Sequence, residues 1–266
     1  DITGDANATD TITNSSAATL TILAGTAELN GASNTTITAT ATNLGDTLSL
    51  QPDGAGDLGT NGGNNQITGF DSIVIRDSVL GNSATTLDLG DYATALTIDA
   101  SALDAADATL TITGTNVSKS MTYTGGAGVD AFTGGAVGDN ISGGAGNDIL
   151  AGTAGNNTID GGAGIDTISL GTGIDHVQGG AGNDIITGAA QIKADDTIDG
   201  GDGTDTLTHT GAIAFSTILG GLSNVEVLAP QGAIAVTLQT PIAGLSTISL
   251  TEAGNQTVTF AAGYTG

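Results

Sequence analysis

Short runs near both ends of the chain alternate apolar residues with Thr, Ser or Asp. A period of two is typical of β-strands with one buried face. Good helix formers such as Glu, Lys, Arg and Met are scarce, which disfavours helices. We therefore predict strands within residues 18–24, 35–41, 46–50, 72–76, 85–90, 95–99 and 109–113, and again within 225–229, 233–238, 246–250 and 256–260.

The middle of the chain, residues 125–208, follows a nine-residue period instead. It divides into nine consecutive lines, of which only 188–199 is longer, at twelve residues. Each line has a glycine-rich half that suits a tight turn and a second half that suits a short strand. The eighth position is always apolar, and we expect these side chains to point inward: Phe132, Ile141, Leu150, Ile159, Ile168, Val177, Ile186, Ile198 and Leu207.

Two such lines form one coil of 18 residues, so successive lines fall on opposite sides of a roll. We predict an all-β fold, a parallel β-roll or β-helix solenoid, flanked by further solenoid-like strands. The expected segments are a β-rich solenoid-like segment at 1–124, the roll at 125–208 and a β-rich segment at 209–266. A separate β-sandwich in the flanks is the alternative.

The sixth position of seven lines is an aspartate, and stacking places these acids in columns. Neighbouring coils lie about 4.8 Å apart. At that distance two unit charges repel by roughly 1 kcal/mol in water and by roughly 3–4 kcal/mol at an effective dielectric constant near 20. Ca²⁺ binds six to eight oxygens from carboxylates and carbonyls and would relieve this repulsion. Gly and Asp as simple turn markers would explain the residue types but not their fixed spacing.

Five lines keep the full pattern GGxGxD, and they supply the principal predicted calcium ligands. These are Gly125, Gly126, Gly128, Asp130, Gly143, Gly144, Gly146, Asp148, Gly161, Gly162, Gly164, Asp166, Gly179, Gly180, Gly182, Asp184, Gly200, Gly201, Gly203 and Asp205. The intervening lines depart from it through Val137, Thr153, Asn157, Leu170 and the insertion around Lys193. We expect a calcium-rich side and a poorer one, on which the weaker ligands are Asp139, Asn157, Asp175 and Asp196.

Charge and composition exclude several classes of function. A net charge of −25 with three cations excludes nucleic-acid binding and disfavours anionic membranes. No apolar run is long enough for membrane insertion. Because the chain has no cysteine, bound metal is the natural candidate for the stabilisation that disulfides give to other extracellular proteins. The two histidines, His176 and His209, are not part of HExxH, and no GxSxG occurs, so we expect no enzyme. We considered Asp53 and Asp57 as additional calcium ligands and the Thr-rich strands as an ice-binding surface, against their ordinary role in β-sheets.

Residues 125–208 resemble the RTX calcium-binding β-roll, whose nonapeptide is a known calcium-binding repeat. The stretches TIDASALDAADATLTITG from Thr97 and LSNVEVLAP from Leu222 resemble bacterial RTX-type surface-layer proteins. The resemblance implies type I secretion, folding at the bacterial cell surface when several Ca²⁺ ions bind, and self-assembly into a lattice or filament. Some members are anchored to lipopolysaccharide or glycan. The alternative is a non-catalytic RTX module of a larger secreted adhesin or enzyme.

Overall fold

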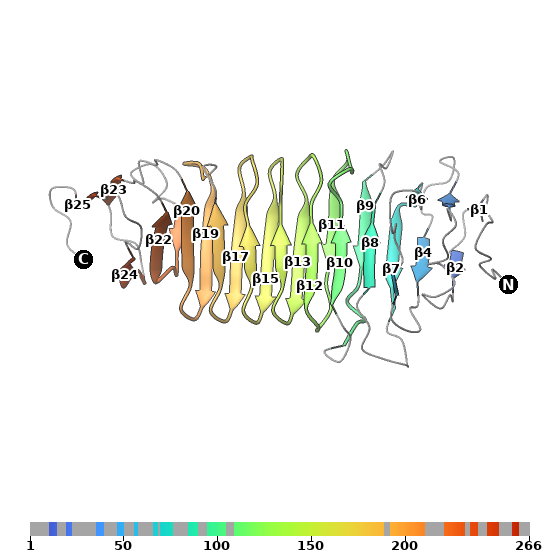
Figure 1. Ribbon diagram of the computed structural model, residues 1–266, viewed down its shortest axis with the longest axis horizontal. Helices are drawn as coiled ribbons and strands as arrows, with labels where there is room; N and C mark the ends of the chain where they lie inside the picture. Colours follow the sequence, from blue (N-terminus) through green and yellow to red (C-terminus); the bar gives the residue numbers. More distant parts are fainter. Residues whose placement is uncertain are drawn as a thin grey trace.

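The structure is a computed structural model. It describes residues 11–14, 20–22, 36–39, 47–50, 56–57, 66–68, 70–76, 85–89, 95–104, 109–188, 192–210, 221–231, 235–238, 244–249 and 257–260. The regular elements of these residues are β-strands, all paired in parallel, stacked along one elongated solenoid (Figure 1). A helix able to cross a membrane is absent from this part of the chain.

Two ten-stranded parallel sheets form the walls of the solenoid. The first sheet contains, in spatial order, β2 (Leu20–Ile22), β4 (Thr47–Leu50), β7 (Ser72–Ile75), β9 (Leu96–Asp99), β11 (Met121–Thr124), β13 (Asn140–Ala145), β15 (Thr158–Ala163), β17 (His176–Ala181), β19 (Thr197–Asp202) and β21 (Leu222–Ser223). The second contains β5 (Gly56–Asp57), β8 (Thr85–Asp88), β10 (Leu110–Thr113), β12 (Asp130–Thr133), β14 (Ile149–Ala151), β16 (Thr167–Ser169), β18 (Ile185–Gly188), β20 (Thr206–Thr210), β22 (Val227–Gln231) and β24 (Thr247–Ile248).

Two smaller parallel sheets complete the described strands. β1 (Thr11–Asn14), β3 (Thr36–Ala39) and β6 (Gln66–Thr68) form one, and β23 (Ala235–Leu238) pairs with β25 (Thr257–Phe260) in the other. Each flank range expected to hold a strand does hold one, so those predictions are confirmed. Strands β1, β5, β6, β11 and β21 were not predicted. β5 and β21 have only two residues each, whereas β1 (TITN) and β11 (MTYT) do alternate and were missed.

The register gives the length of each coil. Within the repeats, paired residues are 18 apart, as in Ile141↔Ile159, and this becomes 21 across the twelve-residue line, as in Ile185↔Thr206. Before the repeats the step is longer, at 25 residues from Ser72 to Thr97 and 28 residues from Leu20 to Leu48. The flanks thus continue the same two sheets as wider coils, which confirms the wider solenoid and not the separate sandwich.

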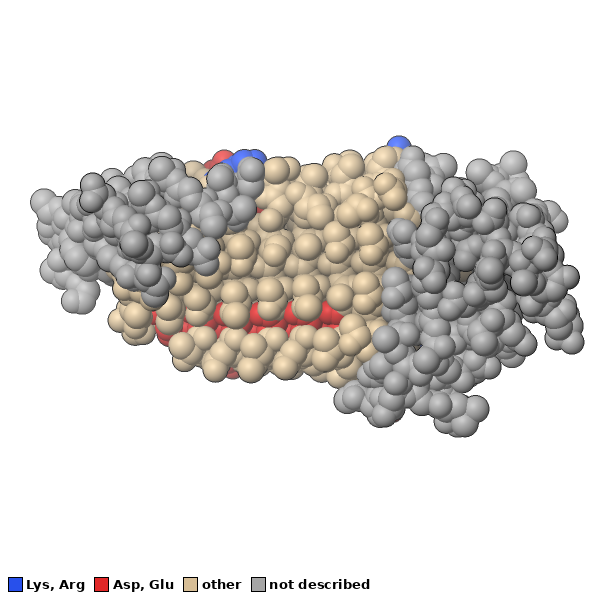
Figure 2. Space-filling view, in the orientation of Figure 1, with Lys and Arg blue, Asp and Glu red and all other residues tan. Residues whose placement is uncertain are grey.

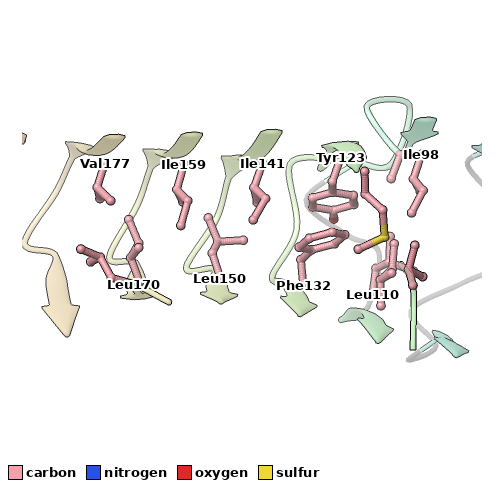
Figure 3. Close-up of a cluster of buried hydrophobic side chains, with 14 of the residues drawn as sticks. Ile98, Leu110, Tyr123, Phe132, Ile141, Leu150, Ile159, Leu170 and Val177 are labelled. Carbon is pink, nitrogen blue, oxygen red and sulfur yellow. The ribbon is translucent and has the colours of Figure 1, made fainter. Parts of the chain in front are cut away.

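One continuous apolar core fills the space between the sheets. All nine inward-pointing side chains of the repeats are buried, as predicted. Figure 3 shows Ile141, Ile159 and Val177 on one side of the core and Phe132 and Leu150 on the other. Tyr123 and Phe132 stack with their ring centroids 4.6 Å apart at the point where the wide coils give way to the narrow ones. These larger rings lie at the wide end of the repeat region, whereas Ile, Leu and Val suffice further along.

Candidate metal sites

Two kinds of turn connect the sheets, and they lie on opposite edges of the solenoid. We call edge 1 the turns that run from the first sheet to the second: 125–130, 143–148, 161–166, 179–184 and 200–205. Edge 2 holds the turns that run back: 134–139, 152–157, 170–175 and the connection between β18 and β19, of which 192–196 are described. Figure 2 shows a row of acidic side chains sunk along the lower side of the repeats, whereas the visible basic side chains lie along the upper side.

The edge 1 turns owe their shape to glycine. In the turn 143–148, Gly144 and Gly146 have φ angles of 102° and 114°, which residues with a Cβ atom rarely adopt. The glycines at the second and fourth positions of the next three edge 1 turns share this conformation. The pattern GGxGxD is therefore a requirement of the backbone at four successive turns.

The sixth-position aspartates of edge 1 form a ladder along the solenoid. The amide of Asp130 donates to Oδ1 of Asp148 at 2.8 Å, and the amide of Asp148 donates to Oδ1 of Asp166 at 2.8 Å. The same bond joins Asp166 to Asp184 and Asp184 to Asp205. In the last four of these aspartates, Oδ1 thus links two coils, and Oδ2 remains available for another partner.

That second oxygen is buried and has no hydrogen-bond partner in four residues: Asp148, Asp166, Asp184 and Asp205. Burial raises the pKa of Asp148 to about 7 and that of Asp166 to about 6. The amide of the preceding coil opposes the shift, and neighbouring aspartates add to it. Burying a carboxylate oxygen without a partner raises the free energy of the folded chain, and a cation bound along this column would lower it.

Backbone carbonyls complete the oxygen-rich surroundings of these atoms. A Cβ placed on Gly143 would lie 2.5 Å from the carbonyl oxygen of Gly161 and would also collide with Oδ2 of Asp148. Gly161 and Gly179 meet the same pair of groups in their own turns. Within the described residues no group of three or more Asp, Glu or His side chains converges on one point. A metal here would be held by carboxylates and carbonyls together, which suits Ca²⁺.

The first edge 1 turn, 125–130, differs from the other four. Gly126 and Gly128 are outside the left-handed region, and Oδ2 of Asp130 accepts a hydrogen bond from the Gly126 amide at 2.8 Å. The sequence predicts five equivalent turns, and the structure brings four of them into one geometry. The preceding 25-residue coil supplies a different neighbour, since the Ala127 amide donates to the Leu103 carbonyl.

On edge 2, protein donors occupy the acceptors that a cation would need. The hydroxyl of Thr153 donates to the carbonyls of Gly134, at 3.0 Å, and Gly135. The amide group of Asn157 donates to the carbonyl of Gly155 at 3.1 Å and to Oδ1 of Asp175 at 3.0 Å. These oxygen acceptors in and beside the turn 152–157 therefore have protein donors and do not need a metal ion.

The other edge 2 turns are modified in different ways. Oδ2 of Asp139 accepts from the Gly135 amide at 2.8 Å, and Oδ2 of Asp196 accepts from the Lys193 amide at 2.6 Å. Leu170 stands where other turns begin with glycine, and its side chain packs in the core (Figure 3). The edge 2 turns therefore differ in geometry from those of edge 1, and Asp139, Asn157, Asp175 and Asp196 as the weaker calcium ligands stay a prediction.

The other candidate residues lie away from the edge 1 column or outside the description. His176 is exposed on β17, and its Nδ1 lies 2.6 Å from the Thr197 hydroxyl, while His209 is buried on β20. Asp57 lies in β5, whereas Asp53 is outside the described residues.

Tyr123 is buried, and burial together with the nearby Asp130 raises the pKa of its phenol.

Sequence reasoning missed one member of the edge 1 column, Glu226. Its Oε2 accepts a hydrogen bond from the amide of Asp205 at 2.8 Å, the same bond that each aspartate makes to the coil before it. Glu226 lies two residues before the buried Leu228, as each sixth-position aspartate lies two residues before a buried apolar residue. That spacing was the available signal, but the sequence GGLSNVE before Leu228 does not follow the pattern GGxGxD.

The class of protein follows from this arrangement: a parallel β-solenoid whose turns carry a column of buried aspartates beside glycine carbonyls. Comparison with known families matches residues 133–168, 160–192 and 193–210 to the RTX calcium-binding nonapeptide repeat. This part of the chain is an RTX β-roll, and repeats of this family bind calcium ions. Such repeats occur in secreted proteins that bind calcium extracellularly, and they are typically non-catalytic. Comparisons with curated proteins and with solved structures gave no match.

Proposed function

We propose that this protein is a non-enzymatic structural component of a bacterial cell surface that folds outside the cell when calcium binds along edge 1. The observation that carries the proposal is the column of four buried aspartate oxygens without partners. A metal that binds only the folded chain adds its binding free energy to the stability of the fold. Calcium would thus do in this cysteine-free protein what disulfides do in others.

Self-assembly is the second part of the proposal, and the outer face of the second sheet supports it. Two rows of residues in register form this face over β10 to β22, and none of them is charged: Thr111, Ala131, Ile149, Thr167, Ile185, Thr206 and Val227 in one, and Thr113, Thr133, Ala151, Ser169, Thr187, Thr208 and Ala229 in the other. Ile149 and Ile185 are 56% and 43% exposed.

The opposite wall is different, because Asp99, Asp160 and Asp199 lie on the outer face of the first sheet. Two copies of a chain with a net charge of −25 repel each other. The uncharged second-sheet face is where they can approach at the lowest electrostatic cost. We therefore infer that a second copy of this chain covers it in a lattice or filament, with anchoring to lipopolysaccharide or glycan as in the surface-layer proteins that the sequence resembles.

Circular dichroism with and without a calcium chelator tests the first part. We expect the β-sheet signal to weaken in chelator at neutral pH and to recover when calcium is added. An unchanged signal in chelator would refute the calcium-dependent fold. Light scattering of the calcium-loaded protein tests the second part, and a monomer at high concentration would favour the alternative, a non-catalytic module of a larger secreted adhesin or enzyme.

A further inference from the structure

The coil that follows the last nonapeptide line departs from the repeat, yet it continues the edge 1 column. In β19 and β21, Asp199 pairs with Ser223, and in β20 and β22, Thr206 pairs with Val227. The chain takes seven steps from Asp199 to Thr206 but only four from Ser223 to Val227. The second turn is therefore three residues shorter than the GGxGxD turn that it covers.

Glu226 compensates for the shorter turn with a longer side chain. Its carboxylate takes the place of the next aspartate in the ladder, 2.8 Å from the Asp205 amide. The backbone of Glu226 is also fixed, because its carbonyl accepts from the amides of Ser246 and Thr247, each at 2.9 Å. An aspartate in this shortened turn would have one methylene fewer with which to reach Asp205.

Asn224 supplies the carbonyl that a glycine supplies in the other turns. A Cβ on Gly200 would collide with the Asn224 carbonyl oxygen and lie 2.7 Å from Oδ2 of Asp205. Asn224 holds a φ of 49°, and its side-chain amide donates to Oδ1 of Asp199 at 2.7 Å. That bond helps to hold the turn in its left-handed conformation.

An independent observation points to a ligand at this position. Oδ2 of Asp205 is buried without a hydrogen-bond partner, and it lies in the same cradle as the Asn224 carbonyl. The residue as a whole has no exposed surface. No protein group donates to this oxygen, whereas on edge 2 Oδ2 of Asp139 and Oδ2 of Asp196 each accept from a backbone amide of their own turn.

We propose that Asp205, the Asn224 carbonyl and Glu226 form a terminal divalent-cation site that closes the edge 1 column outside the nonapeptide repeat. The site rests on the proposed calcium function and extends it beyond residue 210, where the match to the repeat family ends. It makes the coil that contains β21 and β22 a calcium-dependent cap on the roll.

Isothermal titration with CaCl₂ on the full chain tests the site, with Glu226→Gln as the main variant and Glu226→Asp as a charge-preserving one. Asp195→Asn is the matched control, because it removes one exposed acid from an edge 2 turn. We expect both Glu226 variants to bind one calcium ion fewer than the wild type, or to bind one ion at least tenfold more weakly, and the control to be unchanged. Circular dichroism at saturating calcium confirms that each variant is folded.

Equal stoichiometry and affinity in Glu226→Gln and the wild type would overturn the terminal site while leaving the other sites intact. A wild type that binds no calcium would instead refute the proposed function itself. If Glu226→Gln fails to fold, Glu226→Asp decides the matter, since it keeps the charge and changes only the reach. Wild-type binding by Glu226→Asp would then overturn the proposal.

Discussion

At the scale of single residues, the two oxygens of the last four edge 1 aspartates have separate tasks. Oδ1 accepts from the amide of the preceding coil, and Oδ2 lies buried beside glycine carbonyls. An asparagine could keep the first contact, because its side chain retains one carbonyl oxygen, but it could not supply the second negative oxygen. The fold and the metal affinity can therefore be separated by a conservative substitution.

We predict that Asp166→Asn lowers calcium affinity by about tenfold, because affinity depends on the number of charged ligands. The same change should stabilise the chelated protein, because Asp166 carries a raised pKa in a buried position. The increase in Tm on calcium addition should shrink accordingly. Asp160→Asn removes an exposed charge from the neighbouring strand and should leave the calcium response close to that of the wild type.

The edge 2 turn 152–157 offers the reverse experiment. With Thr153→Gly and Asn157→Asp, its sequence becomes identical to that of 143–148. The changes remove a threonine from a φ of 58° and free the carbonyls of Gly134 and Gly135. We predict that the double variant binds one additional calcium ion in isothermal titration. A stoichiometry equal to that of the wild type would show that other features keep edge 2 free of calcium.

At the scale of elements, strand positions could be predicted because alternation and the nonapeptide period both record which residues face the core. Ile141 and Leu150 are buried where the period places them. Edge 1 and edge 2 could be distinguished for the same reason, since Thr153 and Leu170 break the glycine pattern. The altered first turn and the role of Glu226 could not, because they depend on coils of another length, against which Asp130 and Asp205 pack.

The stack of turns also predicts how the chelated fold responds to pH. The folded-state pKa values of Asp148 and Asp166 are about 7 and about 6, above the ordinary value of 3.8. Their protonated forms favour the folded state, so this stability is fully present below pH 3.8 and is lost as pH rises from there to about 7. Calcium requires the deprotonated forms and binds more tightly as pH rises.

We therefore expect the chelated protein to have a higher Tm at pH 5 than at pH 8, and the calcium-dependent increase in Tm to be larger at pH 8. Thermal unfolding followed by circular dichroism measures both. In an Asp148→Asn/Asp166→Asn variant, the pH dependence of the chelated protein should become smaller. A chelated wild type that is equally stable at both pH values would contradict the burial of these carboxylates.

At the scale of the whole molecule, charge is distributed so that each surface has a different use. Edge 1 holds the buried acids whose Oδ2 atoms have no hydrogen-bond partner, and the outer face of the first sheet carries exposed acids such as Asp160. The outer face of the second sheet is uncharged from β10 to β22. Calcium reduces the repulsion along edge 1 and orders the sheet whose outer face we assign to self-association, so assembly should depend on calcium through folding.

This assignment predicts the effect of placing charge on the uncharged face. Ile149→Glu/Ile185→Glu should abolish calcium-dependent self-association in light scattering, because two copies would then bring four new like charges into contact. Calcium stoichiometry should not change, since both side chains point away from edge 1 and the core. Asn140→Glu/His176→Glu is the matched control: these residues are exposed on the first sheet and are likewise separated by one strand, β15. If the control disrupts assembly and the isoleucine variant does not, the interface lies on the first sheet instead.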